Sequence, residues 1–168
     1  MLYIQQIPVF ICIMESDKKF PINDIPFRIL LADDDEDDHF FFEDTLKKLK
    51  FNKQVEIVED GEKLLNYLIQ EKGKLPDVLF LDYNISRING EECLIKIKKH
   101  PALKNLPVIM YSTYLNDDVA DTLYKEGAHF FVRKTDSKSL EKILHKVFTL
   151  LIVEKAARPE RVGFVITL

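Results

Sequence analysis

Acidic side chains in this 168-residue chain stand directly after two apolar runs. The run RILLA is followed by six consecutive acids that begin with Asp33 and Asp34, and the run VLFL is followed by Asp82. Carboxylates a few ångströms apart repel one another and oppose folding unless a cation neutralises them. If the two runs are neighbouring strands, these acids form a site for a hard divalent ion, and their oxygen ligands suit Mg²⁺.

A hydroxyl group and an ammonium group follow two later apolar runs. Ser112 comes directly after VIMY, and Lys134 comes shortly after FFV. An ammonium group neutralises phosphate oxygens, and a carboxylate is a known nucleophile toward phosphorus. Together with the acids, these residues predict a site that accepts and holds a phosphoryl group.

Five short apolar runs alternate with amphipathic segments, and this order indicates how the polar residues are positioned. The runs are nearly unbroken, as in strands that are buried on both faces of a parallel sheet. Apolar residues between them recur at helical spacing. Repeated βα units predict one three-layer α/β domain, in which the carboxyl ends of the strands carry the ligand site. The expected strands are residues 28–32, 55–58, 78–81, 108–111 and 130–132.

Composition excludes several classes of protein. With 46% hydrophobic and 31% charged residues, the chain is neither disordered nor fibrous. Its net charge of −4 lacks the basic surplus of nucleic-acid-binding proteins. The apolar leader of residues 1–14 is too short and too interrupted for a membrane span or a secretory signal. Cys12 and Cys93 form no CxxC motif, which favours a reducing, cytoplasmic location without disulfides or zinc.

We expect three parts along the chain. Residues 1–26 are an N-terminal extension, which is either disordered or non-native sequence upstream of a start at Met14. Residues 27–150 are the α/β domain. Residues 151–168 are a C-terminal tail whose pattern leaves open a ragged end, an extra helical turn or a short strand.

Four segments resemble the receiver domain of two-component response regulators. They occur in the family's order and spacing within residues 27–150, and they read ILLADDDEDD, LFLDYNISRINGEE, LPVIMYST and GAHFFVRK. The resemblance implies a doubly wound, flavodoxin-like (βα)5 fold with strand order 2-1-3-4-5. It also implies a phosphoacceptor of a phosphorelay, a signalling protein and not an enzyme with its own substrate turnover. Because only about 17 residues follow the last expected helix, too few for a DNA-binding domain, we expect a stand-alone receiver.

By position, the resemblance assigns the chemistry to particular residues. Asp82 becomes the phosphoacceptor, and Lys134 becomes the cation that contacts the phosphoryl group. Mg²⁺ is then held by the carboxylates of Asp33, Asp34 and Asp82 and by the backbone carbonyl of Asn84. The phosphoryl donor is a sensor histidine kinase or a histidine phosphotransfer protein.

The resemblance further implies a conformational switch. Ser112 becomes the switch hydroxyl and Phe131 the aromatic switch, and they alter the face formed by the fourth helix, the fifth strand and the fifth helix. That face is where receiver domains meet their partners. The downstream target and the formation of a homodimer stay open, and neither nucleic acid nor membrane is expected as a partner.

The chain departs from the family pattern at three positions. Ser86 and Thr135 replace common prolines, and Phe131 replaces a common tyrosine. The loop after the third strand is therefore expected to be less rigid. A trans peptide bond between Lys134 and Thr135, in place of a frequent cis bond, would shift Lys134. No group that the chemistry requires is missing.

The same residues bear on three other functions. A phosphohydrolase with an aspartyl nucleophile commonly carries a second acid two residues later, where this chain has Asn84. A flavin carrier needs a hydroxyl- and glycine-rich phosphate loop after the first strand, where this chain has carboxylates. A receiver that only docks and is never phosphorylated is excluded by no residue.

Overall fold

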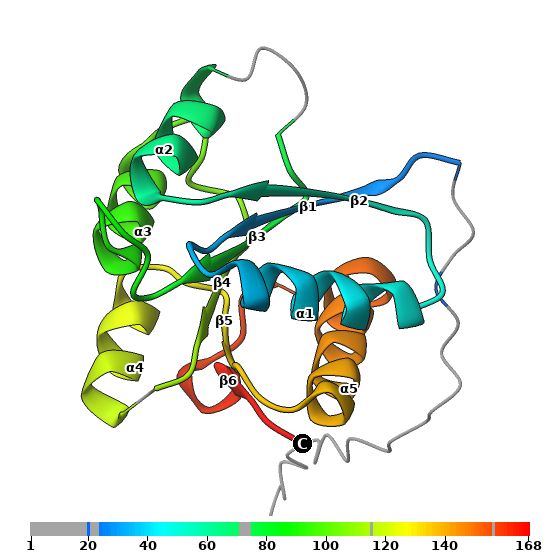
Figure 1. Cartoon of the computed structure of the whole chain (residues 1–168). Coiled ribbons are helices and arrows are strands. Elements are labelled where there is room, and N and C mark those ends of the chain that lie inside the picture. The colour runs from blue at the N-terminus through cyan, green and yellow to red at the C-terminus, as the bar shows by residue number, and fades with distance from the viewer. Residues whose placement is uncertain (1–19, 21–23, 71–74, 115, 156) are drawn as a thin grey trace, which may run out of the picture.

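The computed structural model describes residues 20, 24–70, 75–114, 116–155 and 157–168. In these residues, six parallel strands form one sheet in the order β2-β1-β3-β4-β5-β6 (Figure 1). The strands are β1 (Phe27–Ala32), β2 (Lys53–Val58), β3 (Val78–Asp82), β4 (Val108–Ser112), β5 (Phe130–Arg133) and β6 (Val165–Ile166). The first five have the predicted order 2-1-3-4-5, so the doubly wound α/β fold is confirmed.

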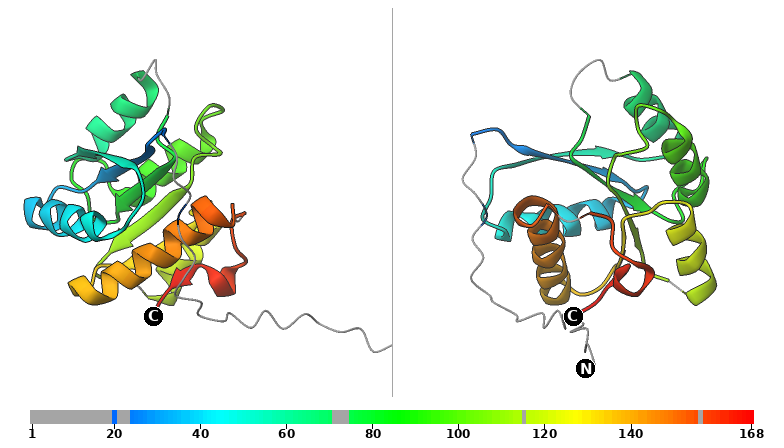
Figure 2. Two further views of the ribbon diagram at one scale, coloured as in Figure 1. Left: turned by 90° about the vertical axis from the view of Figure 1, so that its right-hand side faces the viewer. Right: turned by 180° about the vertical axis from the view of Figure 1, so that it is seen from behind.

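Helices cover both faces of the sheet, as the two rotated views in Figure 2 show. They are α1 (Glu36–Lys48), α2 (Gly61–Gln70), α3 (Gly90–Lys99), α4 (Asp117–Lys125) and α5 (Ser137–Phe148). Asp136 caps α5, because its side chain accepts hydrogen bonds from the backbone amides of Lys138 and Ser139.

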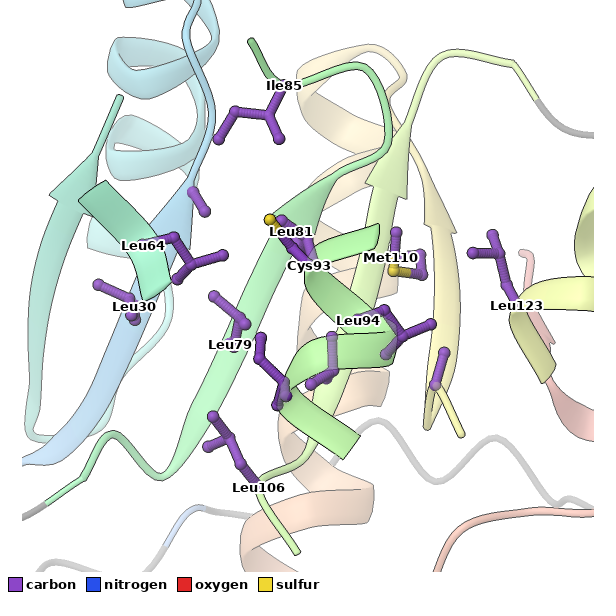
Figure 3. Packing of buried hydrophobic residues seen from close by; sticks show 14 of the residues in the cluster. Leu30, Leu64, Leu79, Leu81, Ile85, Cys93, Leu94, Leu106, Met110 and Leu123 are labelled. Atoms are coloured by element: carbon purple, nitrogen blue, oxygen red, sulfur yellow. The ribbon is translucent and has the colours of Figure 1, made fainter. Parts of the chain in front are cut away.

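Alternate residues of each strand enter two separate cores, because successive side chains in a strand point to opposite faces. Leu30, Leu79 and Met110 pack with residues of α2, α3 and α4 in one core (Figure 3). Ile29, Phe80 and their neighbours pack with residues of α1 and α5 in the other core. Both faces of the central strands are buried, which explains their unbroken apolar sequences.

The strands extend slightly beyond the apolar runs. β2 begins at Lys53, two residues before the expected start, and β3 and β4 include the polar residues Asp82 and Ser112. Backbone pairing continues to these positions, since Asp82 is in register with Tyr111 on β4. Hydrophobicity alone therefore places the strand ends one or two residues short.

Residues after α5 return to the sheet. A π-helical turn at Thr149–Val153 prolongs α5, a 3-10 turn follows at Arg161–Gly163, and β6 then pairs with β5. In Figures 1 and 2 this red segment lies between α4 and α5. Of the three possibilities that the sequence left open for the tail, the structure contains two, an extra helical turn and a short strand.

The N-terminal extension and the possibility of a membrane span were also addressed by the sequence. The predicted N-terminal extension lies almost entirely outside the described residues, which include only Phe20 and residues 24–26 of it. No helix in the described part of the chain is long and apolar enough to cross a membrane.

Candidate functional site

Three of the predicted acids meet at the carboxyl ends of β1 and β3. Ala32 is in register with Leu81, so Asp33, directly after β1, and Asp82, the last residue of β3, lie at the same edge of the sheet. One carboxylate oxygen from each of Asp33, Asp34 and Asp82 lies within 4.8 Å of the other two. Asp33 and Asp82 are buried and Asp34 is exposed, so the cluster opens to solvent on one side.

Lys134 provides the cation of this cluster. It follows β5, and its backbone amide donates to the carbonyl of Ser112 at 2.9 Å, which fixes the chain beside β4. Its Nζ lies 2.7 Å from Asp33 Oδ2 and 3.2 Å from Asp82 Oδ1. The Lys134 side chain is 9% exposed. One buried ammonium therefore bridges the acids of two strands.

A fourth acid, Asp38, shares this ammonium group. Its Oδ2 lies 2.7 Å from Lys134 Nζ, and its side chain is 31% exposed. Asp38 lies in the first turn of α1, where acidic side chains favour the helix N-terminus. Its position four residues after Asp34, one helical turn onward, is the signal that could have placed it in the site.

The charges of the site shift the pKa of its central groups. Burial raises the pKa of Asp82, and the charge of Asp33 raises it further, although Lys134 acts in the opposite direction. Burial alone would lower the pKa of Lys134, but its hydrogen bonds to Asp33 and Asp38 and the charge of Asp82 raise it above its usual value. Lys134 is thus held in its charged form.

Backbone amides orient the two buried carboxylates. The amide of Asn84 donates to Asp82 Oδ2 at 3.0 Å, and the amide of Asp35 donates to Asp33 Oδ1 at 3.1 Å. With Lys134 on the second oxygen of each carboxylate, both oxygens of Asp33 and of Asp82 are engaged. Asn84 itself lies in the turn after β3 and is exposed, and the role of its carbonyl stays a prediction.

The loop after β3 is anchored in spite of Ser86. The amide of Gly61 donates to the carbonyl of Ser86 at 3.1 Å, and Arg87 Nε lies 3.3 Å from the buried carboxylate of Asp60. At Gly90 the chain passes close to the site, because a Cβ there would lie 2.3 Å from the carbonyl oxygen of Asp82. Only glycine permits this approach.

The peptide bond after Lys134 is trans, since the described residues contain no cis peptide bond. A trans bond at this position is predicted from the sequence to shift Lys134. In the structure, Lys134 Nζ nevertheless reaches both Asp33 and Asp82. The replacement of a proline by Thr135 is therefore compatible with a lysine inside the acid cluster.

Ser112, the last residue of β4, and Phe131, in β5, are both buried. Ser112 Oγ has no hydrogen-bond partner among the described residues, which is costly for a buried hydroxyl. Phe131 belongs to the core on the α2–α4 side.

Tyr111 is a residue of the site that was not predicted from the sequence. Its ring forms one wall of the site, and the ring centroid lies 5.3 Å from Lys134 Nζ. An aromatic residue in an apolar run is typical of a buried strand, so the sequence did not indicate a role for Tyr111 in the site.

The donor set fits a divalent cation. Three carboxylate oxygens within 4.8 Å of one another are close enough to ligate one ion, since ligand oxygens about 2.1 Å from Mg²⁺ lie roughly 3 to 4 Å apart. Lys134 supplies one positive charge against four acids, so negative charge remains for an ion to neutralise. Such carboxylate ligands suit Mg²⁺ and Mn²⁺ alike.

The comparisons with known proteins agree on one family. The family model of the response regulator receiver domain matches residues 29–146. The response regulator Rcp1 of a Synechocystis species is 29% identical over 136 residues, which cover 79% of this chain and 88% of that protein. A probable methanogenesis regulatory protein, FilR2 of Methanothrix harundinacea, is 29% identical over 112 residues, which cover 65% of this chain and 72% of its own.

Solved structures share the fold along nearly their whole length. The Mn²⁺-bound form of Rcp1 has a TM-score of 0.70 at 27% identity and covers 80% of this chain and 99% of its own. The phosphorylated cyanobacterial phytochrome response regulator RcpA has a TM-score of 0.71 at 27% identity, with coverages of 81% and 100%. One relative thus carries a divalent metal and another a phosphoryl group.

Proposed function

Because this chain belongs to the family of response regulator receiver domains, we propose that Asp82 accepts a phosphoryl group from a phosphohistidine of a partner protein. Receiver domains of this family interact with histidine kinases. The donor is accordingly a sensor histidine kinase or a histidine phosphotransfer protein. The observation that carries the proposal is the contact of Lys134 with both Asp33 and Asp82, beside the Asp34 carboxylate.

In the proposed transfer, an oxygen of the Asp82 carboxylate forms a bond to phosphorus. The phosphorus–nitrogen bond of the phosphohistidine breaks, and its electron pair goes to that nitrogen of the imidazole, whose other ring nitrogen carries a proton, so the ring leaves neutral. The products are an acyl phosphate on Asp82 and a neutral histidine on the donor. Lys134, 3.2 Å from Asp82 Oδ1, neutralises the oxygens of the incoming group. The Asn84 amide holds the carboxylate in place beforehand.

The metal ion of the proposal is Mg²⁺, held by the carboxylates of Asp33, Asp34 and Asp82 and the carbonyl of Asn84. When bound, such an ion neutralises the charge on the phosphoryl oxygens. The all-oxygen donor set supports this choice, and the Mn²⁺ in the relative Rcp1 supports a divalent ion. Without the metal ion, Lys134 neutralises part of the negative charge of Asp33 and Asp82.

The buried hydroxyl of Ser112 supports a switch that follows the transfer. Its Oγ lacks a hydrogen-bond partner among the described residues, and a phosphoryl oxygen on Asp82 would accept a hydrogen bond from this hydroxyl. Movement of Ser112 toward the phosphoryl group leaves space into which Phe131 rotates, and the face of α4, β5 and α5 changes shape. Phosphorylation then shifts a two-state equilibrium of this face.

Labelling by a small phosphodonor tests the transfer. Phosphoramidate contains a phosphorus–nitrogen bond, as phosphohistidine does. With Mg²⁺ we expect it to raise the intact mass of the protein by one phosphoryl group, and Asp82→Asn should abolish the shift. The control Asp44→Asn removes an acid of α1 whose Oδ2 lies 3.2 Å from Lys48 Nζ, and it should label normally. Full labelling of Asp82→Asn would contradict the proposal.

A further inference from the structure

The C-terminal segment, defined as residues 157–168, lies on the face that the proposed switch alters. Its strand β6 pairs with β5, with Phe131 in register with Val165. Its 3-10 turn contacts α4 through an ion pair of 2.6 Å between Arg161 Nε and Asp121 Oδ1. Lys146 of α5 donates to the carbonyl of Thr167 at 3.4 Å. The segment therefore bridges α4, β5 and α5.

Phe164 anchors this segment. Its side chain is 0% exposed and lies in the same buried core as Phe131 and Leu123. Its ring centroid is 5.5 Å from that of Tyr124 on α4. Its carbonyl accepts the backbone amide of Phe131 at 2.9 Å. The proposed switch residue is thus joined to the segment by a backbone hydrogen bond and by a shared core.

Arg158 and Pro159 attach the segment to α4 and to the turn after it. Arg158 Nε donates to the carbonyl of Ala128 at 2.7 Å, and its guanidinium lies 3.9 Å from the centroid of the Tyr124 ring. The Tyr124 hydroxyl donates to the carbonyl of Pro159 at 3.1 Å. Tyr124 is therefore enclosed by the segment on several sides.

The strand pairing of this segment is short, and the segment does not fill all the space beside α5. β6 pairs through only two residues, and Val162 is 92% exposed. A cavity of about 350 Å³ lies between the segment and α5, lined in part by Leu150, Pro159 and Val165. Like charges also oppose docking at Lys98, because burial and, to a smaller extent, the nearby charge of Arg158 lower the pKa of this lysine to about 8.

We propose that the C-terminal segment is a built-in competitor for the α4–β5–α5 face, which it covers until phosphorylation of Asp82 moves Phe131 and releases it. This inference rests on the proposed function. A sheet edge accepts an added strand through its free backbone groups, so the docked segment takes the place that an extended segment of a partner would use. Release of the segment opens the edge of β5 and the core site of Phe164 to such a partner.

The exchange rate of the Phe131 amide hydrogen reports the docked state. In the full chain without phosphodonor, this amide is bonded to Phe164 and should exchange at least about tenfold more slowly than in Phe164→Ala. Arg158→Ala, which leaves the core side chains intact, should accelerate the same amide. Val162→Ala changes an exposed residue of the same segment and should leave the rate unaltered. Equal rates in all four proteins would overturn the proposal.

Phosphorylation provides the second arm of this experiment. With phosphoramidate and Mg²⁺, we expect the mass shift on the full chain to be accompanied by faster exchange at Phe131 and by faster tryptic cleavage after Arg161. A full mass shift with unchanged exchange would overturn the competitor proposal and leave the proposed function standing. A missing mass shift would contradict the proposed function, and with it the release of the segment by phosphorylation.

Discussion

Lys134 Nζ lies closer to Asp38 Oδ2, at 2.7 Å, than to Asp82 Oδ1, at 3.2 Å. The ammonium group that we propose to receive the phosphoryl oxygens is therefore held partly by the first turn of α1. A nearly buried lysine with three acidic neighbours compensates negative charge that a metal ion would otherwise have to balance alone. The Lys134 ammonium group and a metal ion can thus each neutralise part of the same cluster of acids.

Replacing Lys134 tests this compensation. Lys134→Ala leaves Asp33 and Asp82 buried without a cation, so we expect the free energy of unfolding without metal to fall by about 3 kcal/mol. Mg²⁺ should recover more stability in this variant than in the native chain, because the same acids have lost their internal cation. Thermal melts with and without Mg²⁺ measure both effects. Lys48→Ala, which removes an exposed ion pair with Asp44, is the control and should change neither.

Asp34 is the exposed acid of the cluster, and its replacement separates metal binding from folding. Asp34→Asn removes one negative charge, so the apo protein should become slightly more stable while its affinity for Mg²⁺ falls by at least about tenfold. Titration of the thermal midpoint against the Mg²⁺ concentration gives the affinity. A variant that responds to Mg²⁺ as the native chain does would rule out Asp34 as a ligand.

Gly90 tests the placement of Asp82. A Cβ at this position would lie 2.3 Å from the carbonyl oxygen of Asp82 and 2.8 Å from the Cα of Tyr83, so Gly90→Ala must displace the end of β3. We expect a loss of about 1 to 3 kcal/mol in unfolding free energy and slower labelling by phosphoramidate. In Gly163→Ala the added Cβ meets only a Pro159 side-chain atom at 3.3 Å, and labelling should be unaffected.

His129 predicts a pH dependence of stability. Burial lowers its pKa to about 4, and the neighbouring charges of Lys98 and Arg158 act in the same direction. The unfolded chain binds a proton at this histidine near its ordinary pKa of about 6.5, whereas the folded chain does not until about pH 4. Stability from this group is therefore complete above pH 6.5 and is lost as the pH falls toward 4. Chemical denaturation across this range should show a shallower decline for His129→Asn, and identical slopes would refute the assignment.

The sequence was sufficient for the parts of the fold that rest on local pattern. Unbroken apolar runs identify strands buried on both faces, and an acid directly after such a run must lie at the carboxyl edge of the sheet. For this reason Asp33, Asp82 and Lys134 were predicted together, and the structure brings them together. The adjacency of β1 and β3 came only from the family resemblance, because no local pattern specifies strand order.

Contacts that depend on tertiary packing were not predictable in the same way. β6 has two residues, too few to show a period, and its pairing with β5 depends on the burial of Phe164 against α4. The Lys134 contact with Asp38 depends on the length and direction of a flexible side chain. Tyr111 reads as an ordinary core residue, and only the structure places its ring beside Lys134.

The position of the phosphoryl group tests the function most directly. After labelling of the full chain by phosphoramidate and Mg²⁺, borohydride reduction converts a phosphorylated aspartate into homoserine, which peptide mass spectrometry locates. We predict homoserine at position 82 and unmodified aspartate at positions 33, 34 and 38. Homoserine at any other aspartate, with position 82 unmodified, would contradict the proposed function.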